Sequence, residues 1–320
     1  LLSGAQSVGT VEVAAVDPDQ SNELWMTTTD FLTPTTLSLI EVGKAPEKLK
    51  SMPAYFQTDG LITEQQFATS KDGTKVPYFI VRPKQMPLDG STPTLLWGYG
   101  GFEVSYTSTY NAMAGRGWLQ NGGVFVLANI RGGGEYGPRW HQAALKAKRH
   151  KAYEDFAAVA EDLFARNITS PARLGAQGGS NGGLLMGNMI VQYPQLFGAI
   201  VCQVPLLDMK RYTKLLAGAS WMAEYGDPDT KDWEFIKTFS PYHLLKEGAE
   251  YPAVLFTTST RDDRVHPGHA RKMMAKMEAM NADVRYYENI EGGHGGAANN
   301  QQEAHMRALA YTFLLQQLRK

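Results

Sequence analysis

The segment Gln177–Gly183 reads Gln-Gly-Gly-Ser-Asn-Gly-Gly and runs directly into the apolar stretch Leu184–Val191. A short strand is predicted just before it, so Ser180 lies where a strand turns into a helix. In such a nucleophile elbow the serine hydroxyl is exposed at the edge of a sheet, and flanking glycines let neighbouring backbone pass closely. The backbone N–H of Asn181 can then face a developing oxyanion. A flexible linker is the alternative, but linkers do not continue into large apolar side chains.

The composition is that of an ordinary globular protein, with 43% hydrophobic and 20% charged residues in a chain of 320. A formal net charge of -1, with both signs interspersed, gives no basis for binding nucleic acid or an anionic membrane. No apolar run approaches the roughly 18 residues of a membrane helix, so we expect a soluble protein, in the cytoplasm or the periplasm. The single cysteine, Cys202, excludes an internal disulfide, and its apolar neighbours predict a buried strand residue.

The first 50 residues differ from the rest of the chain. Val11–Val16, Glu23–Thr27 and Thr35–Ile40 are short and either alternating or β-branched, and segments rich in proline and aspartate separate them. This pattern predicts antiparallel strands with no helix between them. Because three or four such strands make a poor domain, we expect residues 1–50 to be the edge of a larger β structure.

From residue 51 to 320, strands and helices alternate after an initial hairpin. The strand segments are apolar throughout, which indicates burial on both faces. The sequence therefore predicts an α/β fold, with a mostly parallel central sheet and helices on both faces. The hairpin is expected at 66–69 and 76–81, further strands at 94–98, 124–129, 172–177, 199–203, 253–258 and 283–287, and helices at 153–167, 184–192, 268–280 and 303–318.

Three polar residues follow strands of this sheet in a characteristic order. Ligand sites in such sheets form beyond the carboxyl ends of the strands. Ser180, Asp262 and His294 lie in post-strand loops in the order of an α/β-hydrolase triad. An imidazole that takes the serine proton activates the hydroxyl, and a carboxylate orients the imidazole. Spacing alone does not separate Asp262 from Asp263, and Asp208, which follows another strand, is a rival.

Two other patterns suggest metal or phosphate binding, but both are incomplete. His266 and His269 have the spacing H-x-x-H without acidic or cysteine ligands beside them in sequence. The glycine runs 98–101 and 132–134 lack the lysine-serine/threonine ending of a P-loop and the full G-x-G-x-x-G spacing. We therefore predict neither a metal nor a nucleotide cofactor.

Five motifs together resemble the peptidase domain of the prolyl oligopeptidase family. They occur in order from about residue 66 to the C-terminus, and the set is highly specific although each motif alone is weak. The resemblance implies a serine peptidase without a cofactor that cleaves on the carboxyl side of proline in short peptides, through an acyl-enzyme. The motifs are Gly98–Phe102, Ala128–Gly137, Gly178–Gly183, Asp262–Val265 and Gly293–Gly295.

The resemblance also implies roles for individual residues. The family's triad falls on Ser180, Asp262 and His294, and the phenol of Tyr99 joins the N–H of Asn181 as an oxyanion donor. An indole can stack on the proline ring of a substrate, although plain core packing is the alternative for Trp221 and for Phe102. Matches to the family's proline pocket are Phe102, Trp221, Tyr225 and Val265, whereas Leu206 stands where the family often has a smaller aliphatic residue. Arg264 matches an arginine that holds the preceding peptide carbonyl.

The resemblance covers only part of the family's architecture. Family members carry a seven-bladed β-propeller that caps the active site, and residues 1–50 resemble the end of its last blade. We expect residues 51–320 to form the peptidase domain with a more open site, which would admit small esters as well as proline-containing peptides. The exposed former interface also favours homo-oligomers. A carboxylesterase using the same triad and an inactive remnant that only binds are the alternatives.

Overall fold

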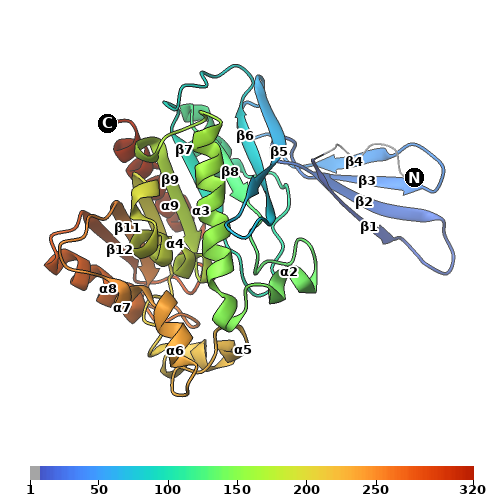
Figure 1. Cartoon of the computed structure of the whole chain (residues 1–320). Helices are drawn as coiled ribbons and strands as arrows, with labels where there is room; N and C mark the ends of the chain where they lie inside the picture. The colour runs from blue at the N-terminus through green and yellow to red at the C-terminus, as the bar shows by residue number, and fades with distance from the viewer. Residues whose placement is uncertain (1–7) are drawn as a thin grey trace.

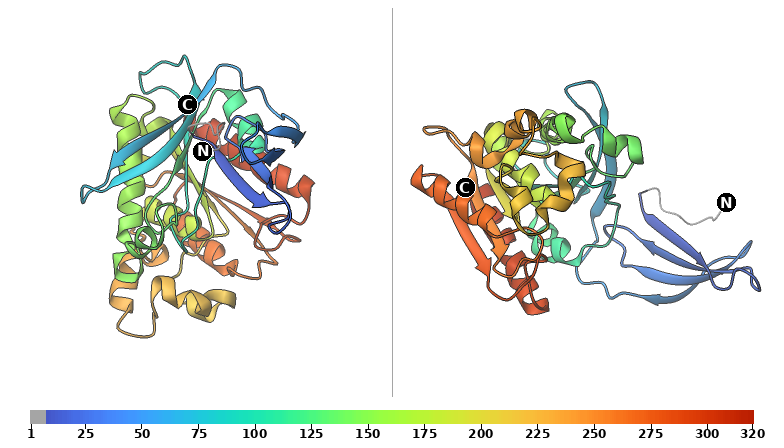
Figure 2. Two further views of the ribbon diagram at one scale, coloured as in Figure 1. Left: turned by 90° about the vertical axis from the view of Figure 1, so that its right-hand side faces the viewer. Right: turned by 90° about the horizontal axis from the view of Figure 1, so that it is seen from below.

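The computed structural model describes residues 8–320 and contains two β-sheets (Figure 1). The first sheet is antiparallel with its strands in chain order, and it projects away from the rest of the molecule in Figure 1 and in the right-hand view of Figure 2. The three strands predicted before residue 50 are confirmed, and the structure adds a fourth. They are β1 (Thr10–Ala15), β2 (Glu23–Thr29), β3 (Thr36–Glu41) and β4 (Glu47–Ser51).

The second sheet has eight strands in the order β12-β11-β10-β9-β7-β8-β6-β5. The β5–β6 hairpin and the β6–β8 pair are antiparallel, whereas the other neighbours are parallel, which confirms the predicted mostly parallel sheet. The strands are β5 (Leu61–Thr69), β6 (Lys75–Pro83), β7 (Thr94–Gly98), β8 (Val124–Ala128), β9 (Leu174–Gly179), β10 (Ala199–Gln203), β11 (Ala253–Ser259) and β12 (Val284–Asn289).

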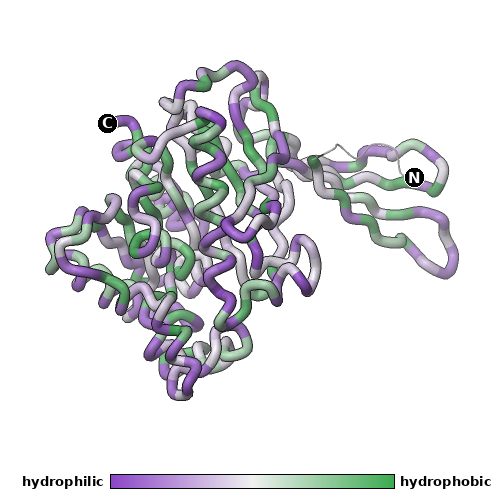
Figure 3. Tube along the Cα trace, in the orientation of Figure 1, coloured by the Kyte–Doolittle hydropathy of each residue, from purple (hydrophilic) through white to green (hydrophobic). Residues whose placement is uncertain are grey.

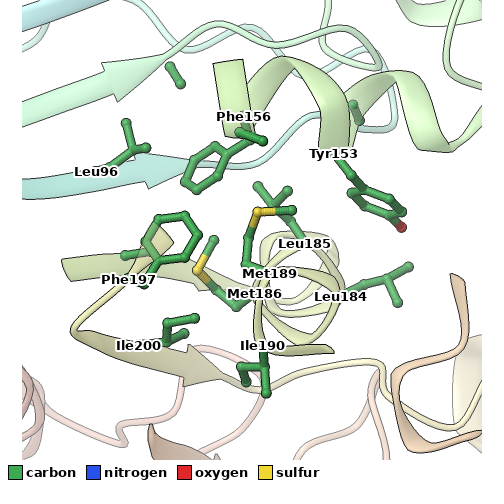
Figure 4. Close-up of a cluster of buried hydrophobic side chains, with 14 of the residues drawn as sticks. Leu96, Tyr153, Phe156, Leu184, Leu185, Met186, Met189, Ile190, Phe197 and Ile200 are labelled. Atoms are coloured by element: carbon green, nitrogen blue, oxygen red, sulfur yellow. The ribbon is translucent and has the colours of Figure 1, made fainter. Parts of the chain in front are cut away.

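Helices cover both faces of the second sheet. On one face, α3 (His150–Ala165), α4 (Asn181–Gln192) and α8 (Gly268–Ala279) enclose a core that includes the side chains in Figure 4. On the other face, α1 (Ala112–Gly117) and α9 (Asn300–Leu318) enclose a second core. The strands can be apolar throughout because both of their faces are buried. Among residues 8–320, no helix combines the length and hydrophobicity needed to cross a membrane.

The connection between β10 and β11 contains short helices that the sequence analysis did not predict. They are α5 (Met222–Tyr225), α6 (Trp233–Ile236) and α7 (Pro241–Leu244), and α2 (Pro138–Gln142) after β8 was missed as well. Each of them makes little more than one turn, so no helical periodicity can develop in its sequence. This connection matters for the site because it carries Trp221 and Tyr225.

Hydrophobic residues are distributed differently in the two sheets (Figure 3). The central strands of the large sheet, β7 to β11, are almost entirely buried, and Cys202 in β10 is fully buried, as predicted, so that burial raises the pKa of its thiol. In the small sheet, several apolar side chains are exposed, among them Val13 at 51% and Trp25 at 40%. A sheet of four strands with exposed apolar residues has little core of its own.

Candidate active site

Ser180 occupies a strained turn between β9 and α4. Its φ of 60° and ψ of -117° lie where residues other than glycine are rarely found, and its N–H donates to the carbonyl of Gln203 at 2.9 Å. A Cβ at Gly178 would lie 2.5 Å from the carbonyl oxygen of Gly182, and one at Gly182 would lie 2.8 Å from the carbonyl oxygen of Gly98. The turn therefore requires glycine at both positions, and it holds the serine at the edge of the sheet.

Asp262 and His294 form a close pair in the loops after β11 and β12. Nδ1 of His294 lies 2.8 Å from Oδ2 and 2.9 Å from Oδ1 of Asp262. The carboxylate also accepts the backbone N–H groups of Arg264 and Val265, each at 2.9 Å, and its side chain is fully buried. A carboxylate fixed in this way orients the imidazole and stabilises its protonated form. Asp263, which the sequence could not separate from Asp262, is exposed.

Asp208, the third candidate for the acid, belongs to a different cluster. Its carboxylate accepts from Arg211 at 3.1 Å and from Lys272 of α8. The backbone N–H groups of Leu207 and Asp208 donate to Nδ1 of His269 at 3.3 and 3.0 Å. Burial lowers the pKa of His269 to about 4, so the ring is neutral and can accept both bonds. Thus His269 anchors the loop after β10, and within the described residues no cluster of three or more His, Cys, Asp and Glu residues suits a metal.

Ser180 and the loop of His294 meet at one cavity of about 280 Å³, which is lined by Ser180 and by Gly295. Because Nδ1 of His294 faces Asp262, Nε2 is the nitrogen that can take the serine proton. Among residues 8–320, the structure contains no hydrogen bond between Ser180 and His294. Catalytic hydrogen bonds are often long in unliganded enzymes and tighten when substrate binds.

Tyr99 and Asn181 flank Ser180 as donors for an oxyanion. Tyr99 and Ser180 line the same cavity. Burial raises the pKa of Tyr99, although the charges of Arg149 and Arg264 act in the opposite direction, so the phenol is protonated at neutral pH. Asn181 is the first residue of α4, where a backbone N–H has no partner within the helix. Both donors can thus face an oxyanion that forms at Ser180.

The side chain of Asn181 is held by three hydrogen bonds. Its Nδ2 donates to the carbonyl of Tyr99 at 2.6 Å, and its Oδ1 accepts from the Tyr225 hydroxyl at 2.7 Å and from Arg149. Asn181 is fully buried. These bonds connect the start of α4 to the backbone of the loop that carries Tyr99 and to α5.

A buried ion pair supports this arrangement. Arg149 is completely buried and donates to Glu224 at 2.9 Å and to the carbonyl of Gly100 at 2.8 Å. Glu224, which is 4% exposed, also accepts the N–H of Phe102 at 3.0 Å and pairs with Nε2 of His141 at 2.7 Å. Although burial disfavours its charge, Tyr153, Tyr225 and Glu224 hold the pKa of Arg149 above its ordinary value. We call Arg149, Glu224, Asn181 and His141 the support network.

Sequence reasoning missed the support network, apart from Asn181. Arg149 stands in the polar segment Lys146–Lys151, which has the composition of a solvated helix flank. The one sequence feature that could have indicated the support network is the position of Glu224, which directly precedes Tyr225 in the stretch that carries Trp221.

The apolar residues matched to the proline pocket come from four separate segments. Leu206, Tyr225 and Val265 are buried, whereas Phe102 and Trp221 are half-buried and pack against the same core. The rings of Phe102 and Tyr225 meet edge to face with centroids 5.7 Å apart. Partial exposure of two aromatic rings beside buried aliphatic residues suits a pocket that receives a small ring. Arg264, whose backbone N–H binds Asp262, has an exposed side chain.

The architecture is that of an α/β hydrolase, with the serine on a strand-to-helix turn. The chain belongs to the prolyl oligopeptidase family, whose sequence model matches residues 110–320. It is 52% identical over 302 residues to the uncharacterized peptidase y4nA of Sinorhizobium fredii, with 94% of this chain and 42% of that protein covered. It is 36% identical over 302 residues to a prolyl endopeptidase of Elizabethkingia miricola, and the match covers 92% of this chain and 43% of that protein.

Solved structures agree with this assignment. A post-proline cleaving enzyme from Rickettsia typhi superposes with a TM-score of 0.90 at 40% identity, and the match covers 97% of this chain and 45% of that one. The chain therefore spans less than half the length of the relatives that it matches.

Proposed function

We propose that this chain is the catalytic part of a serine peptidase that cleaves peptide bonds on the carboxyl side of proline. The observation that carries this proposal is the pair of buried Asp262 and His294 beside the cavity that Ser180 lines. Membership of the prolyl oligopeptidase family and the names of the relatives from Elizabethkingia and Rickettsia support the specificity for proline.

The proposed reaction passes through an acyl-enzyme. The hydroxyl of Ser180 attacks the carbonyl carbon that follows proline while Nε2 of His294 takes its proton. The phenol of Tyr99 and the N–H of Asn181 donate to the resulting oxyanion. His294 then gives its proton to the leaving amine, and water activated by the same ring releases the acyl group. Neither step requires a metal or a cofactor.

Substrate recognition in this proposal divides between stacking and one charged hydrogen bond. Trp221 stacks on the pyrrolidine ring, which has no N–H to offer and is recognised by its shape. Phe102, Tyr225 and the aliphatic residues of the pocket enclose the ring. Arg264 donates to the carbonyl of the residue that precedes proline, because its exposed guanidinium is free to reach a bound peptide.

Two measurements test the proposal against a carboxylesterase and against an inactive remnant. A fluorophosphonate probe should label Ser180, and the Ser180→Ala variant should not react. Arg264→Ala should reduce kcat/KM for an acyl-Gly-Pro anilide about 10- to 100-fold, the worth of a charged hydrogen bond, and leave a simple p-nitrophenyl ester unaffected. Arg261→Ala, which removes an exposed arginine in the same loop, is the control. Equal effects of both variants on the anilide would contradict the peptidase assignment.

We also propose that residues 1–50 belong to the end of a larger β structure and that residues 51–320 form the peptidase domain. The exposed apolar side chains of β1–β4 and the coverage of less than half of each relative support this division. On this basis the 320-residue chain should self-associate through the small sheet. Size-exclusion chromatography should therefore give a concentration-dependent mass that Val13→Lys lowers, and a mass independent of concentration would contradict this expectation.

A further inference from the structure

The cavity beside Ser180 is lined by Tyr99 and Arg264, and also by residues that belong neither to the oxyanion site nor to the proline pocket. Gly179, Gln203 and Thr257 form its floor at the carboxyl ends of β9, β10 and β11. Trp97 and Tyr106, whose rings meet edge to face at 4.5 Å, form one wall. The opposite wall comes from Met306 of α9 and from Gly295 and Gly296. The cavity thus opens at Ser180 and extends toward α9, whereas the proline pocket belongs largely to the connection between β10 and β11.

The position of this cavity relative to His294 identifies the part of the substrate that it faces. His294 must protonate the leaving amine, so the leaving peptide lies on the side of the histidine loop. Gly295 and Gly296, the two residues that follow His294, line the cavity. We propose that the cavity binds the side chain of the first residue of the leaving peptide, an inference that rests on the proposed function.

The floor of the cavity selects among side chains by hydrogen bonding. Thr257 is fully buried, and among the residues that the structure describes none provides a partner for its Oγ1. Gln203 accepts from Gln177 at 2.8 Å through Oε1, so its own amide N–H groups point to other acceptors. A buried hydroxyl without a partner is costly, and a ligand group that bonds to it recovers this cost.

The other residues that line the cavity place a second condition on the side chain that it can bind. Trp97, Tyr106 and Met306 offer aromatic and thioether surface to an apolar stem. Glu303 and Arg307 at the α9 side pair with each other at 2.7 Å, so neither leaves a net charge for the ligand. The guanidinium of Arg264 also lines the cavity and would repel a basic side chain, whereas an uncharged side chain enters without the cost of desolvating a charge. The cavity therefore suits an uncharged side chain with an apolar stem and a hydrogen-bonding end, such as that of glutamine.

Competing peptide substrates test this inference. A series acyl-Gly-Pro-Xaa-amide, with glutamine, methionine or glycine as Xaa, varies only the leaving residue. Methionine is close to glutamine in size but lacks the amide. Wild type should cleave the glutamine peptide about threefold to tenfold faster in kcat/KM than the methionine peptide, the worth of one neutral hydrogen bond.

Thr257→Val removes the hydroxyl without changing the shape of the side chain, and loss of an unpartnered buried hydroxyl should not destabilise the fold. In this variant the ratio of kcat/KM for the glutamine peptide to kcat/KM for the methionine peptide should approach one. Thr258→Val is the matched control, because successive residues of a strand point to opposite faces, and it should keep the wild-type ratio. The glycine peptide has no side chain to enter the cavity, so its kcat/KM should be equal in all three proteins.

The outcomes separate the inference from the proposed function. A ratio near one in wild type, or the same ratio in Thr257→Val and Thr258→Val, would overturn the assignment of the cavity while the glycine peptide is still cleaved. Failure of wild type to cleave any peptide of the series would instead contradict the proposed peptidase activity.

Discussion

Replacing Arg149 by methionine tests whether the support network positions the oxyanion donors. Methionine retains much of the volume but removes the charge, so the bonds to Glu224, Gly100 and Asn181 are lost together. Glu224, which is 4% exposed, then keeps a buried charge without its cation. Breaking a buried ion pair in this way typically costs about 3–5 kcal/mol. This is a large part of the roughly 5–15 kcal/mol that stabilises a typical domain.

The effect on catalysis should appear in kcat. Arg149 holds the carbonyl of Gly100 beside Tyr99 and the side chain of Asn181, so its loss should displace both oxyanion donors. Loss of one well-placed donor typically reduces turnover about 10²- to 10³-fold, and we expect a reduction of this order. The assay combines urea unfolding with hydrolysis of an acyl-Gly-Pro anilide, and fluorophosphonate titration of active sites corrects for unfolded protein.

A double-mutant cycle separates positioning from simple damage. Glu224→Gln keeps one oxygen that can accept from Phe102, and its amide N–H can donate to a neutral Nε2 of His141, but the variant leaves Arg149 with an unpaired charge, so it should be as destabilising as Arg149→Met. The double variant carries neither charge and should be less destabilised than the sum of the single variants. Arg166→Met is the control, because its ion pair with Asp162 has a 39% exposed arginine and should contribute about 0–1 kcal/mol. An Arg149→Met variant with the stability of Arg166→Met and an unchanged kcat would refute the positioning role.

Three further predictions concern Tyr99, Asp262 and His269. Tyr99→Phe should lower kcat about 10²- to 10³-fold with little change in KM, as measured with the same anilide. Asp262→Asn should reduce kcat about 10⁴-fold because the tautomer of His294 is no longer fixed, whereas Asp263→Asn should have no effect. The third prediction concerns His269, whose pKa is about 4 in the folded protein and 6.5 ordinarily. Between these two pH values the unfolded chain therefore binds more protons than the folded one. The free energy of unfolding should consequently fall by about 3 kcal/mol when the pH is lowered from 6.5 to 4. His269→Gln, which keeps an acceptor but does not titrate, should flatten this dependence in urea titrations; parallel curves would contradict it.

Much of the fold could be predicted because its sequence signals are local. The central strands β7 to β11 of the large sheet are buried on both faces, and their apolar runs are short. The elbow at Ser180 was evident for the same reason, since the glycines that a close backbone approach requires stand beside it. The order of Ser180, Asp262 and His294 then indicated the architecture.

The parts that could not be predicted depend on contacts between distant segments. Only the pairing across two loops separates Asp262 from the exposed Asp263, which has the same neighbours in sequence. Arg149 resembles the surface lysines around it, yet it is buried where its side chain bonds to Glu224 of α5 and to the carbonyl of Gly100. A charge at the start of a helix is usually solvated, so no local pattern could indicate a buried cation there.

The support network also joins two functions that the sequence places far apart. The ring of Tyr225 meets that of Phe102 edge to face, its hydroxyl donates to Asn181, and Glu224 beside it accepts the backbone N–H of Phe102. In the proposed function, the groups that enclose the proline ring are therefore bonded to the groups that hold the oxyanion donors. A substrate that fills the proposed pocket would restrain both sets together, so that part of its binding energy would be expressed in the transition state rather than in the ground state. We therefore expect substrates without proline to lose kcat as well as affinity, because an empty pocket leaves Phe102 and Tyr225 less restrained.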